Sequence, residues 1–249
     1  MLNSALQQSP IYTDILRARG VHAFADANGT QMIARGPVVA VFRGIRPPQS
    51  RRAIIMHPDT DQSAALRAAG FRQIMTPATI AQMDLIAPTP PHPKWQRACE
   101  RARNAIMKVE HRPLTTNDHW VFQSDRDQQR IKGFRSLPHD ISARWPPDKT
   151  LFSVAICAGR PIAAMLFLRH GNGATYQIGW SGPTGRAQNA HHRLLVGACA
   201  ELKKRGATSL DLGVVDTENC AGLARFKLRS GATPRRLGGT WLRLPRWRS

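Results

Sequence analysis

The sequence predicts an α/β (α+β) fold in which a mixed sheet is flanked by helices. One observation is the alternation of short β-rich runs with amphipathic helical segments along the 249-residue chain. Another is a run of three consecutive strands joined by tight turns in residues 151–181. The composition agrees, because 42% hydrophobic and 21% charged residues are typical of a globular protein with a buried core.

The first elements are expected to form a small unit over residues 1–86. Residues 9–20 predict a helix, because a serine N-cap precedes a proline and a glycine closes the segment. Asn28-Gly29 is typical of the turn between two strands. Further elements follow in order: a strand at 37–44, a basic loop at 45–52, a strand at 53–58, a helix at 59–70 capped by Asp or Thr, and a strand at 71–75.

A segment with four prolines, residues 87–93, is interpreted as a linker or a rigid loop. A helix is expected to begin at Lys94, because apolar residues recur three and four positions apart as far as Val109. A second, polar helix is expected over about 116–135. The predicted domains are therefore 1–86 and 87–249.

The last block has the most regular pattern. Three strands form an antiparallel meander with glycine-containing turns, at 151–158, 162–170 and 174–181. A helix is expected over about 190–205 and ends at Gly206. Its last turn is basic, and positive charges at the C-terminal end of a helix interact favourably with the helix dipole. Then come a strand at 209–215, a loop and short helix at 217–229, and closing strand material.

The chain is strongly basic, with 36 Lys and Arg against 16 Asp and Glu and a formal charge of +20. Such a surface attracts polyanions, for example tRNA, DNA, a nucleotide cofactor or anionic lipid. The alternative is codon usage that favours arginine, since 29 of the basic residues are Arg. Codon usage alone does not explain so few acidic residues.

Several classes of protein are not expected. Four widely spaced cysteines give neither a disulfide framework nor metal-binding spacing, so reduced thiols without a metal site are expected: Cys99, Cys157, Cys199 and Cys220. The N-terminal segment shows no signal peptide, and no run approaches about 18 apolar residues. The expectation is a cytoplasmic protein without a membrane span.

An ordered set of segments resembles the C-terminal core of the GNAT acyltransferase fold: KWQRACERARNA, ATYQIGWSG, LDLG and GLARFKLRSGA. With QSPIY near the start, the closer resemblance is to the FemAB-like branch, in which two GNAT-like units share one chain. The resemblance covers about residues 94–241, and residues 1–86 would be a degenerate first unit. It implies transfer of an acyl group to an amine. The donor is acetyl-CoA in ordinary GNAT enzymes, and aminoacyl-tRNA in FemAB-type enzymes, whose acceptor is a peptidoglycan precursor.

Acyl-CoA is the expected donor and co-substrate, with aminoacyl-tRNA as the alternative. The charge favours tRNA, whereas the compact length and the lack of a coiled-coil insertion favour a smaller donor. A loop before a helix offers free backbone N–H groups for phosphate. The expected donor-binding residues are Gly185, Arg186, Gln188 and Asn189. This loop departs from the GNAT pattern Q/R-x-x-G-x-G/A, and it is alternatively an ordinary strand–helix connection.

Forming an amide from an activated ester requires a base and a stabilised oxyanion. His170 and Asp211, expected on adjacent strands, are the candidate bases. The alternatives are a turn histidine and a structural acid paired with an arginine. Tyr176 is a candidate proton donor to the leaving group, or else a half-buried strand aromatic. Lys227 is implied by the resemblance to hold phosphate or the oxyanion, and its alternative is a solvated helix charge.

Basic residues at both ends of the second block are the candidate substrate-binding residues. The helix from Lys94 would present Trp95 and Arg101 to an anionic acceptor or to tRNA, unless this is only a solvated face. Arg225 and Trp241 lie in the basic end of the chain. The expected acceptor is the amine of a small molecule or peptide. A nucleic-acid-binding module without catalysis, or a pseudoenzyme, remains open.

Overall fold

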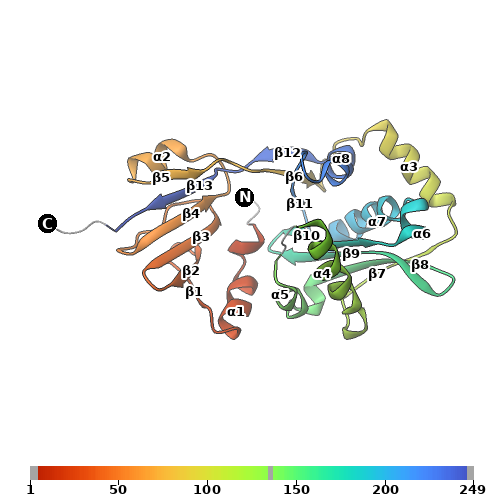
Figure 1. Cartoon of the computed structure of the whole chain (residues 1–249), viewed down its shortest axis with the longest axis horizontal. Coiled ribbons are helices and arrows are strands. Elements are labelled where there is room, and N and C mark those ends of the chain that lie inside the picture. The colour runs from red at the N-terminus through yellow and green to blue at the C-terminus, as the bar shows by residue number, and fades with distance from the viewer. Residues whose placement is uncertain (1–4, 134–136, 246–249) are drawn as a thin grey trace. The chain divides into compact units, whose positions relative to one another are not determined.

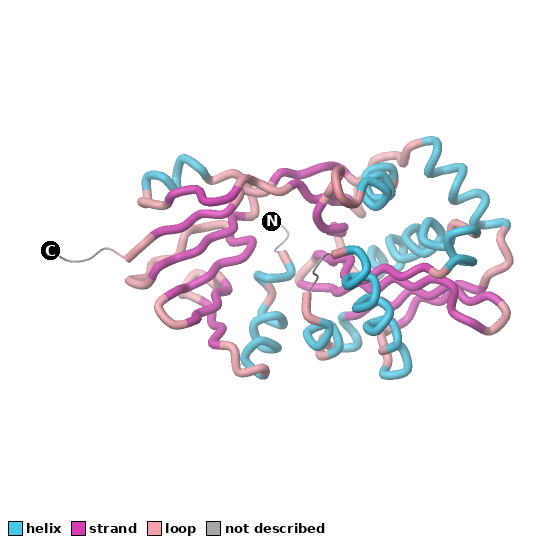
Figure 2. Tube along the Cα trace, viewed as in Figure 1, coloured by secondary structure: helices cyan, strands magenta, loops and turns pink. Residues whose placement is uncertain are grey.

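The computed structural model describes residues 5–133 and 137–245, which form two compact units (Figure 1). Unit 1 runs to Ile80 and resumes at Pro234, and unit 2 spans Ala81–Thr233. Both units are mixed α/β structures, in which a sheet carries helices (Figure 2). This confirms the predicted fold class.

Unit 1 is built on a six-stranded sheet in the order β1-β2-β3-β4-β13-β5. The strands are β1 His22–Ala25, β2 Gln31–Arg35, β3 Val38–Gly44, β4 Ala53–Pro58, β5 Arg72–Met75 and β13 Thr240–Arg243. The helices are α1 Pro10–Ala18 and α2 Ser63–Ala68, with a 3-10 turn η1 at Leu6–Gln8.

Local chemistry explains the start and end of these elements. The Asp26 carboxylate accepts the N–H groups of Asn28 and Thr30 at 2.9 Å, and Gly29 takes the left-handed conformation with φ 77°. The β1–β2 hairpin therefore forms at the predicted turn. Helix α2 is shorter than the predicted 59–70. It begins at Ser63, because the carboxylate of Asp61 accepts the Ser63 N–H in a turn of its own.

The two parallel strands at the centre of unit 1 remain paired along their length. β3 pairs with β4 from Val38–Ala53 to Gly44–Pro58, with one irregularity at Arg43, whose φ is 58°. The connection between them, residues 45–52, contains neither a helix nor a strand. The sheet buries a small apolar core: Met32, Ala34, Val39, Val41, Ile54, Met56, Leu66, Phe71 and Trp241.

The end of the chain corrects the sequence prediction, which assigned residues 234–249 to the second domain. β13 instead lies between β4 and β5, and Trp241 pairs with Met56 and Gln73. The Trp241 side chain is fully buried in the core of unit 1. The alternation of apolar and basic residues in this strand satisfies either sheet, so its partner is not visible in the sequence.

Unit 2 is built on a seven-stranded sheet in the order β12-β6-β11-β10-β9-β8-β7. The strands are β6 Thr79–Asp84, β7 Lys108–Arg112, β8 Thr150–Cys157, β9 Arg160–His170, β10 Gly173–Ser181, β11 Ser209–Val214 and β12 Thr233–Arg236. The helices are α3 Pro93–Asn104, α4 Trp120–Lys132, α5 His139–Ala143, α6 Pro183–Ala187, α7 Ala190–Lys204 and α8 Ala221–Arg229. Short 3-10 turns are η2 Thr116–Asp118 and η3 Pro147–Lys149.

The first half of unit 2 differs from its prediction in three places, one of which is helix α5, which was not expected. Strand β6 was not expected. The helix expected from Lys94 to Val109 ends at Asn104, and Val109 lies in strand β7. Ile106, counted as part of the apolar stripe, is 86% exposed between the two elements. The apolar spacing continued past the helix end by coincidence.

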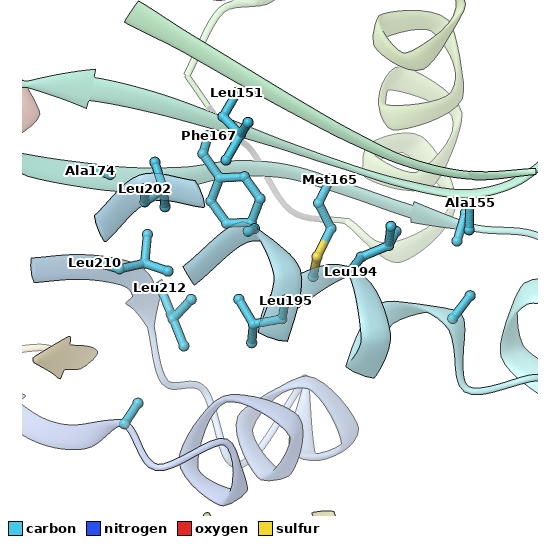
Figure 3. Close-up of a cluster of buried hydrophobic side chains, with 14 of the residues drawn as sticks. Leu151, Ala155, Met165, Phe167, Ala174, Leu194, Leu195, Leu202, Leu210 and Leu212 are labelled. Carbon is cyan, nitrogen blue, oxygen red and sulfur yellow. The ribbon is translucent and has the colours of Figure 1, made fainter. Parts of the chain in front are cut away.

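Helices α7 and α4 cover opposite faces of this sheet (Figure 1). The leucines of α7 pack with Leu151, Met165 and Phe167 (Figure 3). On the other face, the Trp120 ring of α4 lies edge-on to Phe152, with centroids 6.3 Å apart. Leu151 and Phe152 are neighbours in β8, so their side chains point to opposite faces.

The parallel strands β10 and β11 pair over only three residues, Gly173–Thr175 with Ser209–Asp211. Beyond this stretch β10 has an irregularity between Tyr176 and Ile178 in its pairing with β9. We call the unpaired parts, residues 176–181 of β10 and 212–214 of β11, the open strand pair. In the open strand pair, the backbone groups of β10 and β11 that face each other do not form ladder hydrogen bonds.

No described helix combines the length and the apolar character needed to cross a membrane. All four cysteines are free thiols and are partly buried. Within residues 5–133 and 137–245, no three His, Cys, Asp or Glu side chains gather in a way that could hold a metal ion.

Candidate active site

Lys227 of α8 lies beside the open strand pair. Its side chain is buried, and its Nζ donates a hydrogen bond of 2.8 Å to the backbone oxygen of Val214, the last residue of β11. Burial lowers the pKa of Lys227, and the nearby Asp211 carboxylate opposes that change. A lysine amine is thus held at the point where β11 ends.

Asp211 occupies the last paired position of β11, opposite Thr175. Its Oδ1 accepts the N–H of Gly213 at 2.7 Å, and Gly213 has a φ of 79°, which a side chain would strain. This turn directs the end of β11 toward Lys227, since the Lys227 Nζ lies 3.6 Å from the position that a Gly213 Cβ would take. Asp211 therefore shapes the strand end and supplies charge beside the lysine.

Tyr176 is the first residue of β10 beyond the paired stretch. Its ring packs near Phe167, with centroids 5.6 Å apart, and its hydroxyl lies over Gly179, where a Cβ would overlap it. Burial raises the pKa of Tyr176 well above its ordinary value, and the charge of Asp125 adds to the rise. The phenol is therefore protonated at neutral pH.

His170 does not join these residues. It lies at the end of β9, opposite Gly173, and β10 separates it from the strand of Asp211. The two residues were expected on adjacent strands, and this expectation is wrong. The buried His170 shares a 2.8 Å hydrogen bond between Nε2 and Thr175 Oγ1, which fixes the turn end of the strands.

The expected donor loop is folded into the short helix α6. Gly185 is buried against β9, where a Cβ would overlap the Ile162 carbonyl oxygen, so it packs the helix onto the sheet. Arg186 is exposed and donates to the backbone oxygen of Ser181. Gln188 has a buried Oε1 without a hydrogen-bond partner in the described chain, and Asn189 begins α7 with a φ of 54°.

Of the predicted substrate-binding residues, the two tryptophans are buried and the charged residues are exposed. Trp95 is buried, not exposed to a ligand. Its ring centroid lies 4.3 Å from that of His192 and 4.7 Å from that of Phe226, and the three rings come from α3, α7 and α8. Lys94, Arg101 and Arg225 are exposed on α3 and α8. Trp241 belongs to unit 1 and is buried there, which removes it from this set.

A buried carboxylate–imidazole pair on the α4 face was not predicted from the sequence. Asp125 Oδ2 lies 2.7 Å from His139 Nε2 and also accepts a 2.6 Å hydrogen bond from the Gln129 side chain. Both side chains are largely buried. The i, i+4 spacing of Asp125 and Gln129 was the only local signal, because His139 reaches them from a different helix.

No family model matches the chain, and no curated protein sequence matches it. Solved structures do resemble it. The crystal structure of FemX has a TM-score of 0.75 at 12% identity, covering 97% of this chain and 92% of that one. The C-terminal domain of a putative lysylphosphatidylglycerol synthetase from Agrobacterium fabrum has a TM-score of 0.62 at 13% identity, covering 95% and 88%.

A tandem GNAT protein from the clavulanic acid biosynthesis pathway has a TM-score of 0.50 at 13% identity, covering 88% of this chain and 79% of that one. At these identities the likeness concerns the fold. This chain has a GNAT-like fold with two GNAT-like units, as the sequence resemblance implied.

Proposed function

We propose that this protein transfers an acyl or aminoacyl group from an activated ester or thioester to an amine. The observation that carries the proposal is the open strand pair, where a buried lysine amine and a protonated tyrosine lie beside unpaired strand ends. Both the attack on a carbonyl and the departure of a leaving group need such groups. The acceptor would be the amine of a small molecule or peptide.

Lys227 is the proposed group that stabilises negative charge. Within the described chain its Nζ donates to one acceptor, the oxygen of Val214, and an ammonium group has three N–H donors. The remaining donors can meet a developing oxyanion or a phosphate. In a buried environment a fixed cation interacts with such charge more strongly than it would in water.

Aminoacyl-tRNA is the donor that the surface chemistry favours. Helix α6 and the buried Gly185 occupy the stretch where a glycine-rich phosphate loop was expected. Exposed cations instead line α3 and α8: Lys94, Arg97, Arg101, Arg103 and Arg225. Cations on helix surfaces suit the phosphates of a polyanion. A neighbour named for lysylphosphatidylglycerol, an aminoacylated lipid, supports aminoacyl transfer as the reaction class.

Tyr176 is the proposed proton donor to the leaving oxygen. A phenol whose pKa is raised transfers its proton to a strongly basic alkoxide more readily than to a thiolate. A ribose ester releases an alkoxide, whereas a CoA thioester releases a thiolate. The raised pKa of Tyr176 thus supports an ester donor.

Acyl-CoA is the second candidate donor, favoured by the open edge of β10. A strand edge without a partner offers N–H and C=O groups that can pair with amides. The pantetheine arm of CoA carries two amides in an extended chain. Arg186, exposed beside this edge, would then contact its phosphates.

A thermal-shift assay at low and high salt separates the donors. The ligands are bulk aminoacyl-tRNA, uncharged tRNA and acetyl-CoA. We expect stabilisation by aminoacyl-tRNA that exceeds that by uncharged tRNA and falls as salt rises. Stabilisation by acetyl-CoA that persists at high salt would establish the second donor. No shift with any of the three would contradict the proposed function.

The role of Lys227 is tested with Lys227→Met, which keeps the length of the side chain and removes the charge. Transfer of a labelled amino acid from bulk charged tRNA to an amine should fall about 100- to 1,000-fold. Lys203→Met is the matched control, because Lys203 is exposed on α7. A Lys227→Met protein with full transfer activity would remove the lysine from the mechanism.

A further inference from the structure

The Asp125–His139 pair lies outside the groups assigned so far. Its imidazole and carboxylate come from different helices, and the helix-to-helix contact buries both. The Nε2–Oδ2 distance of 2.7 Å is that of a charge-assisted hydrogen bond. Gln129 donates to the same carboxylate oxygen and holds it in place.

This hydrogen bond fixes which ring nitrogen carries the proton. A carboxylate accepts, so Nε2 of His139 donates, and the neutral ring then keeps its lone pair on Nδ1. Among the residues that the structure describes, Nδ1 has no hydrogen-bond partner, whereas Nε2 lies 2.7 Å from Asp125 and 3.3 Å from the Gln129 side-chain nitrogen, and the His139 side chain is 12% exposed. An imidazole oriented by a carboxylate, with no hydrogen bond to its second nitrogen, is the arrangement of a general base.

Helix α4, which carries Asp125, also contacts β10 of the open strand pair. Gln128, on the same helix as Asp125, donates a 3.3 Å hydrogen bond to the backbone oxygen of Gly179. The Tyr176 hydroxyl lies over that glycine, and the charge of Asp125 acts on the phenol. Helix α4 therefore contacts the part of β10 that has left β11, and the Asp125 carboxylate is near enough for its charge to act on Tyr176 there.

We propose that His139 is the base that accepts the proton of the acceptor amine, and that Asp125 positions it. This inference rests on the proposed function. The amine nitrogen forms a bond to the carbonyl carbon and loses its proton to His139 Nδ1. The bond from that carbon to the ribose oxygen breaks, and the oxygen keeps the electron pair and takes the Tyr176 proton. Solvent then removes the proton from His139 and returns one to Tyr176.

The test compares two acceptor amines in the full-length protein with bulk charged tRNA. Ethylamine attacks through its small unprotonated fraction at neutral pH, and its attack product holds the extra proton tightly, so that transfer needs a base. Trifluoroethylamine is a free amine whose attack product loses its proton readily to water. With His139→Gln, transfer to ethylamine should fall about 100- to 10,000-fold, and transfer to trifluoroethylamine should fall far less. Asp125→Asn should show the same preference with a smaller loss.

His119→Gln is the matched control. The exposed His119 packs on the Phe122 ring with centroids 5.1 Å apart, as His139 does with centroids 5.6 Å apart. His119 therefore has the same aromatic neighbour as His139 but no hydrogen bond to Asp125. It should leave both rates unchanged. Equal losses with both amines in a folded His139→Gln protein, or no loss, would overturn the assignment. If the wild-type protein transfers to neither amine from charged tRNA or acetyl-CoA, the proposed function itself fails.

Discussion

Each unit has a parallel strand pair near the middle of its sheet, and the two pairs differ in how far they stay together. In unit 1, β3 and β4 are paired from end to end, and residues 45–52 join them without a helix. In unit 2, β10 and β11 separate after Thr175 and Asp211, and α6 and α7 lie between them in the chain. Lys227, Tyr176 and Asp211 lie at or next to the pair that separates.

The difference shows what an open strand pair requires. Strands that separate leave carbonyl groups that must find other donors. In unit 2 side chains from the surrounding helices supply them: Gln128 to Gly179, His191 to Trp180 at 2.8 Å, and Lys227 to Val214. Polar side chains therefore gather where β10 and β11 separate, because they replace the missing ladder hydrogen bonds. Fully paired strands do not require such side chains.

Among variants that test the difference between the two units, the largest loss of stability is expected at Trp241. Trp241→Ala removes a fully buried side chain from the small core of unit 1 and should lower its free energy of unfolding by about 3–5 kcal/mol. Urea denaturation followed by circular dichroism measures the loss. If function resides at the open strand pair, stabilisation by charged tRNA should survive in this variant. Loss of that response would assign the function to unit 1 as well.

A smaller effect concerns the seating of α7 on the sheet of unit 2. Gly197 lies against the His111 ring, so that a Cβ there would overlap Nε2. Gly197→Ala should destabilise the protein by about 1–3 kcal/mol, since the ring cannot move without disturbing its 2.8 Å hydrogen bond to Ser153.

Gly222→Ala in α8 is the control for this substitution, because nothing lies within 4 Å of its new Cβ. It should be neutral or stabilising by up to about 1 kcal/mol, as for alanine in other helices. Equal denaturation midpoints for the two variants would mean that α7 is not held against the sheet as described.

The smallest expected effect is a shared dependence on pH. Burial lowers the pKa of His57 in unit 1 and of His111 in unit 2 below the ordinary 6.5. The unfolded chain therefore binds protons at a higher pH than the native protein, and stability is lost as the pH falls below about 6.5. Urea midpoints measured from pH 8 to pH 5 check this decline. His57→Gln should flatten part of it, and a midpoint that rises on acidification would reverse the sign.

The sequence predicted those features whose cause is local. The meander over 151–181, helix α7 and its end at Gly206 follow from apolar periodicity and glycine turns, and all are present. Lys227, Tyr176 and Asp211 were identified partly by resemblance, and all three lie at or next to the open strand pair. Their roles remain predictions.

Features that depend on distant partners were not predictable. His139 meets Asp125 only because α5 folds back on α4, and neither residue type signals a partner. Gly185 fits a phosphate loop by composition, yet its lack of a side chain serves close packing on Ile162. Periodicity shows which face of a strand is apolar, but it does not show which sheet will bury that face. Trp241 is an example, because its strand β13 joins the sheet of unit 1.

The position of β13 fixes an order of assembly during synthesis. β4 and β5 are not neighbours in the sheet, because β13 lies between them and is made after all the other described strands. The strands from β7 to β11 can pair while β13 is still unmade. Unit 1 must therefore complete its sheet after unit 2 has been made, which reverses the usual vectorial order and leaves the facing edges of β4 and β5 open to chaperones until β13 is made.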